Sequence, residues 1–266
     1  MAFLLVFIPV FAFADDVSNA SSVSDVSDVS SQAVVSDISE PETEPVITSG
    51  NAIVVMSVET GQILLNTANG REVDPTCATK LMTAMLAFDM ANGLDNQVTV
   101  DAEALKNIGK KGDISAPMLG LRAGNTATVR QLLQATLISA ANDACNALAY
   151  SVSGGDIAGF VEKMNARATE IGCEHTYFTN TTGLYDGEAY TTVEDVAKIA
   201  AAFYRYNTLL DISSQPTYVI GGSTIHTKNY LRSETLMRGC TIRESKGMIA
   251  GQRTDKSDYC LITAGE

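Results

Sequence analysis

The sequence predicts an α+β fold in which strands from both ends of the chain form one sheet and helices occupy the middle. Valine-rich alternation near residue 51 is typical of a strand, and β-branched runs return after residue 217. Between them, apolar residues recur at helical spacing. Strands and helices separated along the chain in this way favour an antiparallel sheet with a helical lobe. At 266 residues and 45% hydrophobic content, the chain can bury one large core.

The first residues predict an export signal. An apolar run from Phe3 to Ala14 ends in the small-x-small sequence Ala12-Phe13-Ala14. The run is too short to span a bilayer. No Lys or Arg precedes it, so a true start further upstream stays open. We therefore expect residues 1–14 to be the signal peptide of an exported protein, with a buried strand as the alternative.

An acidic tract follows, from residue 15 to residue 48. It repeats Val, Ser and Asp before turning to Glu and Pro, and it contains eight acidic and no basic residues. Such a composition cannot bury enough apolar surface to fold, so we expect a disordered spacer. Subtracting these eight charges from the net charge of -13 leaves about -5 for the rest, an ordinary value for a soluble domain. The sequence has no basic patch, which argues against nucleic acid as a partner.

The folded domain is expected to span residues 49–266, and local patterns predict its elements in order. A hairpin is predicted first, because two alternating segments flank a turn that contains Gly. Helices follow, with Thr128 capping one and Thr191 or Thr192 capping another. The predicted strands and extended segments are 51–58, 63–66, 98–100, 217–220 and 260–264, and the predicted helices are 80–92, 128–136, 143–152, 157–171 and 192–206.

The cysteines and histidines predict neither a metal site nor a bound cofactor. None of the five cysteines forms a CxxC pair, and His175 and His226 stand alone. Cys145 and Cys173 lie in apolar patterns, so we expect packing residues rather than a disulfide. We expect His175 in a surface turn. An odd cysteine count leaves at least one free thiol.

The most informative segment is Asp74–Thr83, which places Cys77 three residues before Lys80. Residues at i and i+3 share one face of a helix, so a Lys amine there can take the proton of an attacking group. Cys77 is therefore a candidate nucleophile and Lys80 a candidate general base.

The order of several motifs resembles the D-alanyl-D-alanine carboxypeptidases, which are low-molecular-mass penicillin-binding proteins and serine peptidases. Besides the Cys77 segment, the matching segments are Gly61–Leu64, Gly120–Leu133, Asn142–Ala144, Phe160–Asn165, Phe178–Leu184 and Thr191–Ala197. The resemblance implies a β-lactamase-like fold, with a helical lobe on a five-stranded antiparallel sheet and the active site in a groove between them. It also implies peptidoglycan stem peptides as partners and β-lactams as ligands.

All three of the family's groove motifs are altered here. The resemblance places a Ser at position 77, where this chain has Cys. The second motif aligns as Ala140-Ala141-Asn142, so Ala140 replaces the Ser whose hydroxyl relays a proton to the leaving amine, while Asn142 is kept. Ser139 lies one residue early and is expected to point elsewhere.

The third motif, Lys-Thr-Gly on an edge strand, aligns with Ile249, Ala250 and Gly251. This substrate-binding position has therefore lost the cation and the hydroxyl that would hold a terminal carboxylate. A shifted register that recruits Lys246 is the alternative. The resemblance also implies a further strand and helix after residue 266, so we expect a sheet that lacks one strand.

These changes predict weak or absent turnover. Losing one positioned donor typically costs on the order of 100- to 1000-fold in rate, and losing a carboxylate clamp removes roughly 2–5 kcal/mol of binding. Two alternatives stay open: an active peptidase that uses Cys77 with Lys80, and a non-catalytic protein that binds wall peptides.

Overall fold

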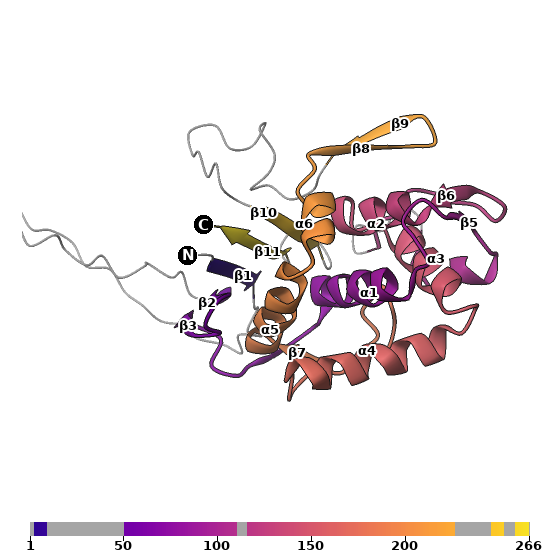
Figure 1. Ribbon diagram of the computed structural model, residues 1–266. Helices are drawn as coiled ribbons and strands as arrows, with labels where there is room; N and C mark the ends of the chain where they lie inside the picture. Colours follow the sequence, from indigo (N-terminus) through magenta and orange to yellow (C-terminus); the bar gives the residue numbers. More distant parts are fainter. Residues whose placement is uncertain (1–2, 10–50, 111–115, 227–245, 253–258, 266) are drawn as a thin grey trace, which may run out of the picture.

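The computed structural model describes residues 3–9, 51–110, 116–226, 246–252 and 259–265. It consists of one antiparallel sheet beside a lobe of helices, and the first and last described strands lie next to each other (Figure 1). The predicted α+β class is therefore confirmed. The expected spacer at residues 15–48 lies outside the described residues.

The sheet has five strands in the order β10-β11-β1-β2-β3, and every neighbouring pair is antiparallel. The predicted hairpin is confirmed as β2 (Asn51–Ser57) and β3 (Ile63–Asn66). The predicted strand at 260–264 is part of β11 (Tyr259–Gly265), and β10 (Lys246–Gln252) forms one edge.

The middle strand is β1 (Phe3–Pro9), which comes from the apolar N-terminal run. It pairs along seven residues with β2 and along five with β11. With β1 in the middle, the sheet has five strands, one of them from the N-terminal run. The expectation that the sheet is incomplete at the C-terminus, where a further strand would follow residue 266, stays a prediction. Removal of residues 1–14 as a signal peptide stays a prediction; it would take the middle strand out of this sheet.

The helical lobe is built from six α-helices and one short 3-10 helix within the described residues. They are α1 (Thr76–Met90), η1 (Glu103–Leu105), α2 (Val129–Ile138), α3 (Asn142–Val152), α4 (Ile157–Ile171), α5 (Val193–Tyr204) and α6 (Asn207–Ser213). Two predicted caps are confirmed: Thr128 forms a capping box with Gln131, and the Thr192 hydroxyl accepts from the Asp195 N–H.

One predicted helix is wrong at its end. Instead of continuing through Tyr206, α5 stops at Tyr204, and α6 begins at Asn207. Two hydrogen bonds between residues three apart end the helix: the Arg205 N–H donates to the Ala202 carbonyl, and the Tyr206 N–H donates to the Phe203 carbonyl. The turn reorients the chain, so that Leu209 and Leu210 enter the core.

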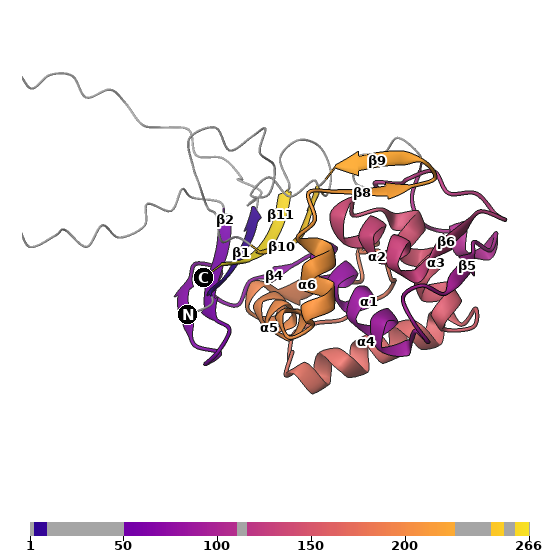
Figure 2. The same ribbon diagram turned by 45° about the horizontal axis from the view of Figure 1, so that its top comes forward.

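Three two-stranded sheets complete the fold. They are β4 (Glu72–Val73) with β7 (Thr191–Thr192), β5 (Gln97–Thr99) with β6 (Thr126–Thr128), and β8 (Thr217–Ile220) with β9 (Ser223–His226). The β8–β9 hairpin lies along the outside of α2, as both orientations of the ribbon show (Figures 1 and 2).

Helix α1 is the centre of the core. It contacts α2, α3, α4 and α5, and its first turns also meet β10 and β11. Consecutive residues from Cys77 to Ala87 are buried. A helix that is covered on nearly all sides needs apolar residues on nearly all sides, which explains the run of Leu, Met and Ala along it. No helix among the described residues is both long and apolar enough to cross a membrane.

Candidate active site

The start of α1 carries the first candidate pair. The Asp74 carboxylate accepts from the Thr76 N–H and from the Thr76 hydroxyl, each at 2.9 Å, which fixes the backbone where the helix begins. Thr76 has a positive φ of 21°, an uncommon conformation for a residue with a side chain. Cys77 and Lys80 follow one turn apart, and both are buried, at 2% and 5% exposure.

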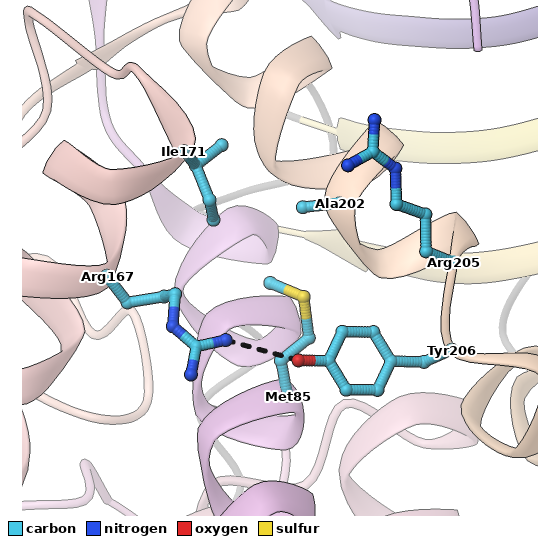
Figure 3. A pocket seen from close by; sticks show the side chains of 6 residues that line it. All are labelled: Met85, Arg167, Ile171, Ala202, Arg205 and Tyr206. Carbon is cyan, nitrogen blue, oxygen red and sulfur yellow. Dashed lines mark hydrogen bonds between the residues drawn. The ribbon is translucent and has the colours of Figure 1, made fainter. Parts of the chain in front are cut away.

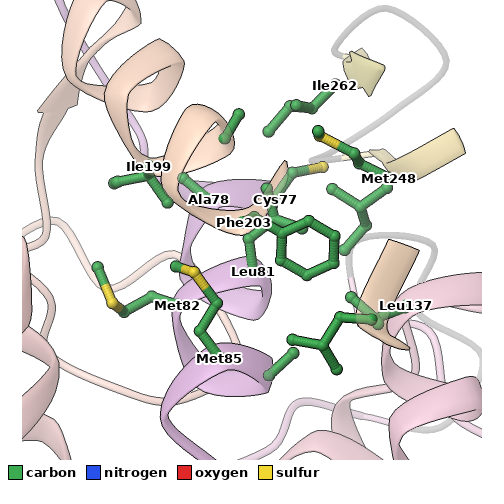
Figure 4. Packing of buried hydrophobic residues seen from close by; sticks show 14 of the residues in the cluster. Cys77, Ala78, Leu81, Met82, Met85, Leu137, Ile199, Phe203, Met248 and Ile262 are labelled. Atoms are coloured by element: carbon green, nitrogen blue, oxygen red, sulfur yellow. The ribbon is translucent and has the colours of Figure 1, made fainter. Parts of the chain in front are cut away.

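Cys77 lies in apolar surroundings. Figure 4 shows it at the start of α1 among Phe203, Met248 and Ile262, which belong to the same core cluster. The nucleophile position is therefore located where the sheet packs on α1. A substrate carbonyl would have to enter this packed contact to reach the sulfur.

Lys80 faces a loop that precedes β7. Its ammonium donates to the Thr182 carbonyl. One turn further along α1, the Thr83 hydroxyl donates to the neighbouring Thr181 carbonyl at 2.8 Å. The Cys145 thiol, which comes from α3, donates to the same Thr181 carbonyl at 3.1 Å. Two consecutive carbonyls of this loop thus receive donors from α1 and α3.

The loop is itself held by α3. The Thr181 hydroxyl donates to the Asn146 side-chain carbonyl at 2.6 Å, and the Asn146 amide donates to the Ala104 carbonyl at 2.8 Å. Burial raises the pKa of the Cys145 thiol to about 11, although the positive charge of Lys80 opposes this increase. Cys145 is therefore a protonated donor at neutral pH. Thr83, Cys145, Asn146, Thr181 and Thr182 are called the Lys80 frame below.

The second motif lies in the turn between α2 and α3. Ala140 is buried and has a φ of 53°, in the left-handed region that costs about 1–2 kcal/mol for a residue with a Cβ. The buried Asn142 amide donates to the Ile108 carbonyl at 3.0 Å. The Asn142 side-chain oxygen has no hydrogen-bond partner among the described residues, so it is an acceptor without a donor.

Ser139 points away from this turn, as predicted. Its hydroxyl is 2.9 Å from the Tyr218 hydroxyl on β8. Burial raises the pKa of Tyr218 to about 12, so the phenol stays protonated over the physiological range. This pair ties the end of α2 to the β8–β9 hairpin and does not replace the hydroxyl that Ala140 lacks.

Asp143 holds the turn from the other side. One carboxylate oxygen accepts from the Leu119 N–H at 3.0 Å and the Ala144 N–H at 2.9 Å; the other accepts from the Gly120 and Leu121 N–H groups at 2.7 and 2.9 Å. The carboxylate is buried and lies at the start of α3, where the helix dipole favours a negative charge.

The third motif lies on β10, which contacts α1 and α2. Ile249 is fully buried in the core and pairs with Ile262 on β11, while Ala250 pairs with Leu261 and Gly251 with Cys260. The pairing register shifts between Gly247 and Ile249. Ile249 is thus a packing residue in this structure, and the substrate-binding role of these positions stays a prediction.

The structure brings the three motifs to one junction. Helices α1 and α2 and strand β10 contact one another, and α3 contacts α1 and α2. The elements that carry the three motifs therefore meet, and a shared site of Cys77, Lys80, Ala140 and Asn142 stays a prediction. Lys246, the alternative cation, pairs through its backbone with Ala264 at the start of β10.

A separate cavity of about 360 Å³ opens at the other end of α1. Met85, Ile171 and Ala202 form an apolar floor, and Arg167, Arg205 and Tyr206 form its rim (Figure 3). Met85 is eight residues after Cys77, which corresponds to about 12 Å along the helix axis. Arg167 already binds Asp89 at 3.0 Å and the Tyr206 hydroxyl at 3.1 Å. This cavity therefore lies outside the candidate site.

Cys145, Cys173 and His175 take structural places, and Cys240 lies outside the described residues. Cys145 and Cys173 are free and buried, as predicted for packing residues, and burial raises the pKa of Cys173 to about 12. His175 is exposed, as predicted, and its N–H donates to Asp195. Among the described residues, no group of three or more His, Cys, Asp or Glu could hold a metal ion.

The carbonyls of Thr181 and Thr182 are the part of the site that sequence reasoning missed. Phe178–Leu184 is recognisable as a family segment, but its residue types carry no acid, base or nucleophile near Lys80. The contact is made by backbone carbonyls, which every residue has. Only the occurrence of this segment among the ordered motifs could have indicated a role.

The fold is β-lactamase-like, and comparison with known proteins gives the family. Residues 38–266 match the family model described as D-alanyl-D-alanine carboxypeptidase. The chain belongs to this family.

Individual relatives are distant. The chain is 27% identical over 233 residues to D-alanyl-D-alanine carboxypeptidase DacF of Bacillus subtilis, with 84% of this chain and 56% of the relative covered. It is 29% identical over 166 residues to DacB2 of Mycobacterium tuberculosis, with 62% and 54% covered. The chain thus spans about half the length of these relatives. The fold is similar to penicillin-binding protein 5 of Haemophilus influenzae, with a TM-score of 0.66 and 24% identity over 80% of this chain and 63% of that one.

Proposed function

We propose that this chain is a D-alanyl-D-alanine carboxypeptidase-like protein of peptidoglycan metabolism that binds wall stem peptides with weak or no turnover. The observation that carries the proposal is which functional side chains the junction has and which it lacks. It keeps Lys80 and Asn142 in buried, hydrogen-bonded positions, whereas Cys77, Ala140 and Ile249 contribute no hydroxyl and no second cation.

The chemistry of the reaction explains why turnover should be weak. Acylation requires a bond from the nucleophile to the peptide carbonyl carbon, cleavage of the C–N bond to the terminal D-alanine, and a proton for the leaving amine. Hydrolysis is completed when water cleaves the acyl bond and the nucleophile regains its proton. Cys77 can supply a nucleophile, and Lys80 can accept its proton. Ala140 has no group to pass that proton on, so the acyl-transfer step lacks its relay.

Peptide binding is proposed because acceptor and donor groups remain at the junction. The Asn142 side-chain oxygen is a buried acceptor with no partner among the described residues. Buried polar groups are normally paired, so this oxygen is a candidate acceptor for a ligand N–H. The N–H groups of a stem peptide are donors of this kind. Asn142 is fully buried, so a peptide reaches it only when the junction opens.

Lys80 favours the second candidate function, a peptidase that uses Cys77. Lys80 lies three residues after Cys77 on α1, the spacing at which a lysine amine can take the proton of an attacking group. Against this candidate stands the 2% exposure of Cys77, since a nucleophile must meet its substrate.

Release of D-alanine from a pentapeptide and binding to purified peptidoglycan test the proposal together. We expect binding, with D-alanine release at least about 100-fold below that of an intact family member. The Cys77→Ala variant is the matched control, and it should bind as the wild type does. Release that disappears in this variant would establish the Cys77 peptidase instead, and absence of binding would overturn the proposal.

Labelling with a fluorescent penicillin separates the candidates further. A chain without a competent nucleophile should not retain the label after denaturation, whereas an active Cys77 would. Export to the cell wall is part of the proposal and is supported by the apolar run that ends at Ala14. Detection of the protein in the extracytoplasmic fraction tests it.

A further inference from the structure

We propose that Asn180 is a positioning residue for Lys80. Its side-chain amide folds residues 180–184 into a turn that directs the Thr182 carbonyl at the Lys80 ammonium. The inference rests on the proposed function only in that Lys80 belongs to the candidate site.

The Asn180 side chain organises the turn with both ends of its amide. The side-chain oxygen accepts from the Thr182 N–H at 3.1 Å, the Thr182 hydroxyl at 3.1 Å, the Gly183 N–H at 2.8 Å and the Leu184 N–H at 3.2 Å. The side-chain nitrogen donates to the Leu184 carbonyl at 2.9 Å. An Asn side chain that bonds to backbone a few residues further on replaces the bonds of regular structure and fixes the turn.

The turn is clamped between two rigid parts of the lobe. On one side, a Cβ at Gly183 would lie 2.2 Å from the Thr76 carbonyl, so the turn backbone touches the start of α1. On the other side, the Thr181 hydroxyl binds Asn146 on α3. Gly183 has a φ of 70°, which only glycine adopts without strain. These contacts with α1 and α3 therefore hold the Thr182 carbonyl in a fixed position.

A buried ammonium needs such an acceptor. Leaving a charged donor unpaired in the interior costs several kcal/mol. The Lys side chain is a flexible four-carbon stem, so the acceptor, and not the stem, determines where the amine rests. Displacing the Thr182 carbonyl should therefore remove an acceptor that holds the Lys80 amine and shift the amine within the Lys80 frame. The proposed proton transfer from Cys77 to Lys80 depends on this position of the Lys80 amine.

Asn165 supplies a matched control. It also clamps backbone with both ends of its amide: its oxygen accepts from the Phe178 N–H at 2.7 Å, and its nitrogen donates to the Phe178 carbonyl at 2.9 Å. It lies in the same part of the chain, but neither of its bonds reaches the turn at 180–184. Asn165→Ala thus removes a similar clamp without touching the acceptor of Lys80.

The experiment is competitive labelling of lysine amines with trace acetic anhydride, read for each lysine by peptide mass spectrometry over a range of pH. In the full chain, Lys80 should be protected relative to the exposed Lys163. Asn180→Ala should raise Lys80 labelling roughly tenfold, which corresponds to about 1.4 kcal/mol. Asn165→Ala should change it less than about twofold, which corresponds to about 0.4 kcal/mol.

Two results would overturn the inference: Lys80 that stays protected in Asn180→Ala, or equal exposure of Lys80 in Asn165→Ala at the same loss of stability in urea. If Asn180→Ala does not fold, Asn180→Asp takes its place, because it keeps the acceptor oxygen and loses the donor to Leu184. The labelling needs neither turnover nor peptide binding. A chain that fails to bind peptidoglycan therefore refutes the proposed function and leaves this test unaffected.

Discussion

The residues on the two sides of Lys80 differ in polarity and in hydrogen bonding. Behind it, the Lys80 frame is polar and buried, and its hydrogen bonds join α1, α3 and the turn at 180–184. In front of it, Cys77 and Ile249 are buried in the apolar core cluster, and Ala140 is buried as well. The Lys80 frame holds the lysine. The positions of Cys77, Ala140 and Ile249, called the front below, are where a reaction would take place.

This difference shows which changes a fold tolerates. A polar group in the frame cannot be lost alone, because its partner would be left buried and unpaired at a cost of about 1–3 kcal/mol. At positions 77, 140 and 249 the apolar or thiol side chains impose no comparable pairing. The fold therefore constrains the side chains of the frame more tightly than those in front of it.

The largest effect is expected at Ile249. If this residue belongs to the core, Ile249→Lys should destabilise the protein by about 4 kcal/mol or more, because it buries an unpaired charge. Urea unfolding measures the loss, and Ile249→Val is the control, with about 1 kcal/mol expected. A mild effect of the lysine would show that position 249 faces the junction, as the motif alignment predicts.

The next largest effect is expected at Asp143, whose buried carboxylate accepts hydrogen bonds from four backbone N–H groups at the start of α3 and in the segment 119–121. Asp143→Ala leaves four backbone N–H groups without their acceptor and should cost about 3 kcal/mol in urea unfolding. Asp143→Asn retains one oxygen and should cost less than the alanine variant. Equal and small losses in both would mean that water replaces the carboxylate, and that the turn is not held from this side.

Alkaline pH should weaken the frame. The pKa of Cys145 is raised by burial from 9.0 to about 11, so the unfolded chain loses its proton first. Its contribution is full below pH 9 and is lost as the pH rises through 11, on the order of 2 kcal/mol. Stability curves in urea from pH 8 to 11 should therefore fall less steeply in Cys145→Ala. Identical slopes in the two proteins would contradict the assignment.

The smallest effect is expected at Ala140. Its φ of 53° favours glycine, so Ala140→Gly should stabilise the protein by about 0.5–1 kcal/mol. Ala147 lies inside α3 and is the control: Ala147→Gly should destabilise by about 1 kcal/mol. Thermal unfolding resolves both signs. A loss at Ala140 would mean that its methyl group packs better than its backbone strain suggests.

Local sequence patterns predicted much of the secondary structure. Helix α4 has the bounds that its periodicity predicts, and Thr128 and Thr192 cap helices because their hydroxyls accept from nearby N–H groups. Both signals depend on neighbours within a few residues. The ordered motifs likewise brought Cys77, Lys80 and Asn142 to one junction, since each motif is short and recognisable by side-chain type.

Long-range pairing could not be predicted in the same way. An apolar heptapeptide has the same composition in an export signal and in a buried strand, and the partners of β1 lie far away in the chain. The acceptors of Lys80 are backbone carbonyls, which have no sequence signature. The depth of Ile249 also depends on β11 packing on α1. In each case the deciding contact is made by residues distant in sequence.

The middle place of β1 sets an order of folding for this chain. Phe3 pairs with Gly265, so the two ends must meet before the sheet can close. The lobe from α1 to α6 is built from contacts over shorter separations, and such contacts form faster because less loop entropy is lost. We therefore expect the lobe to assemble early and the sheet late. During synthesis, β1 would keep one edge unpaired until the residues of β11 emerge, and in that interval another extended segment could take the place of β11.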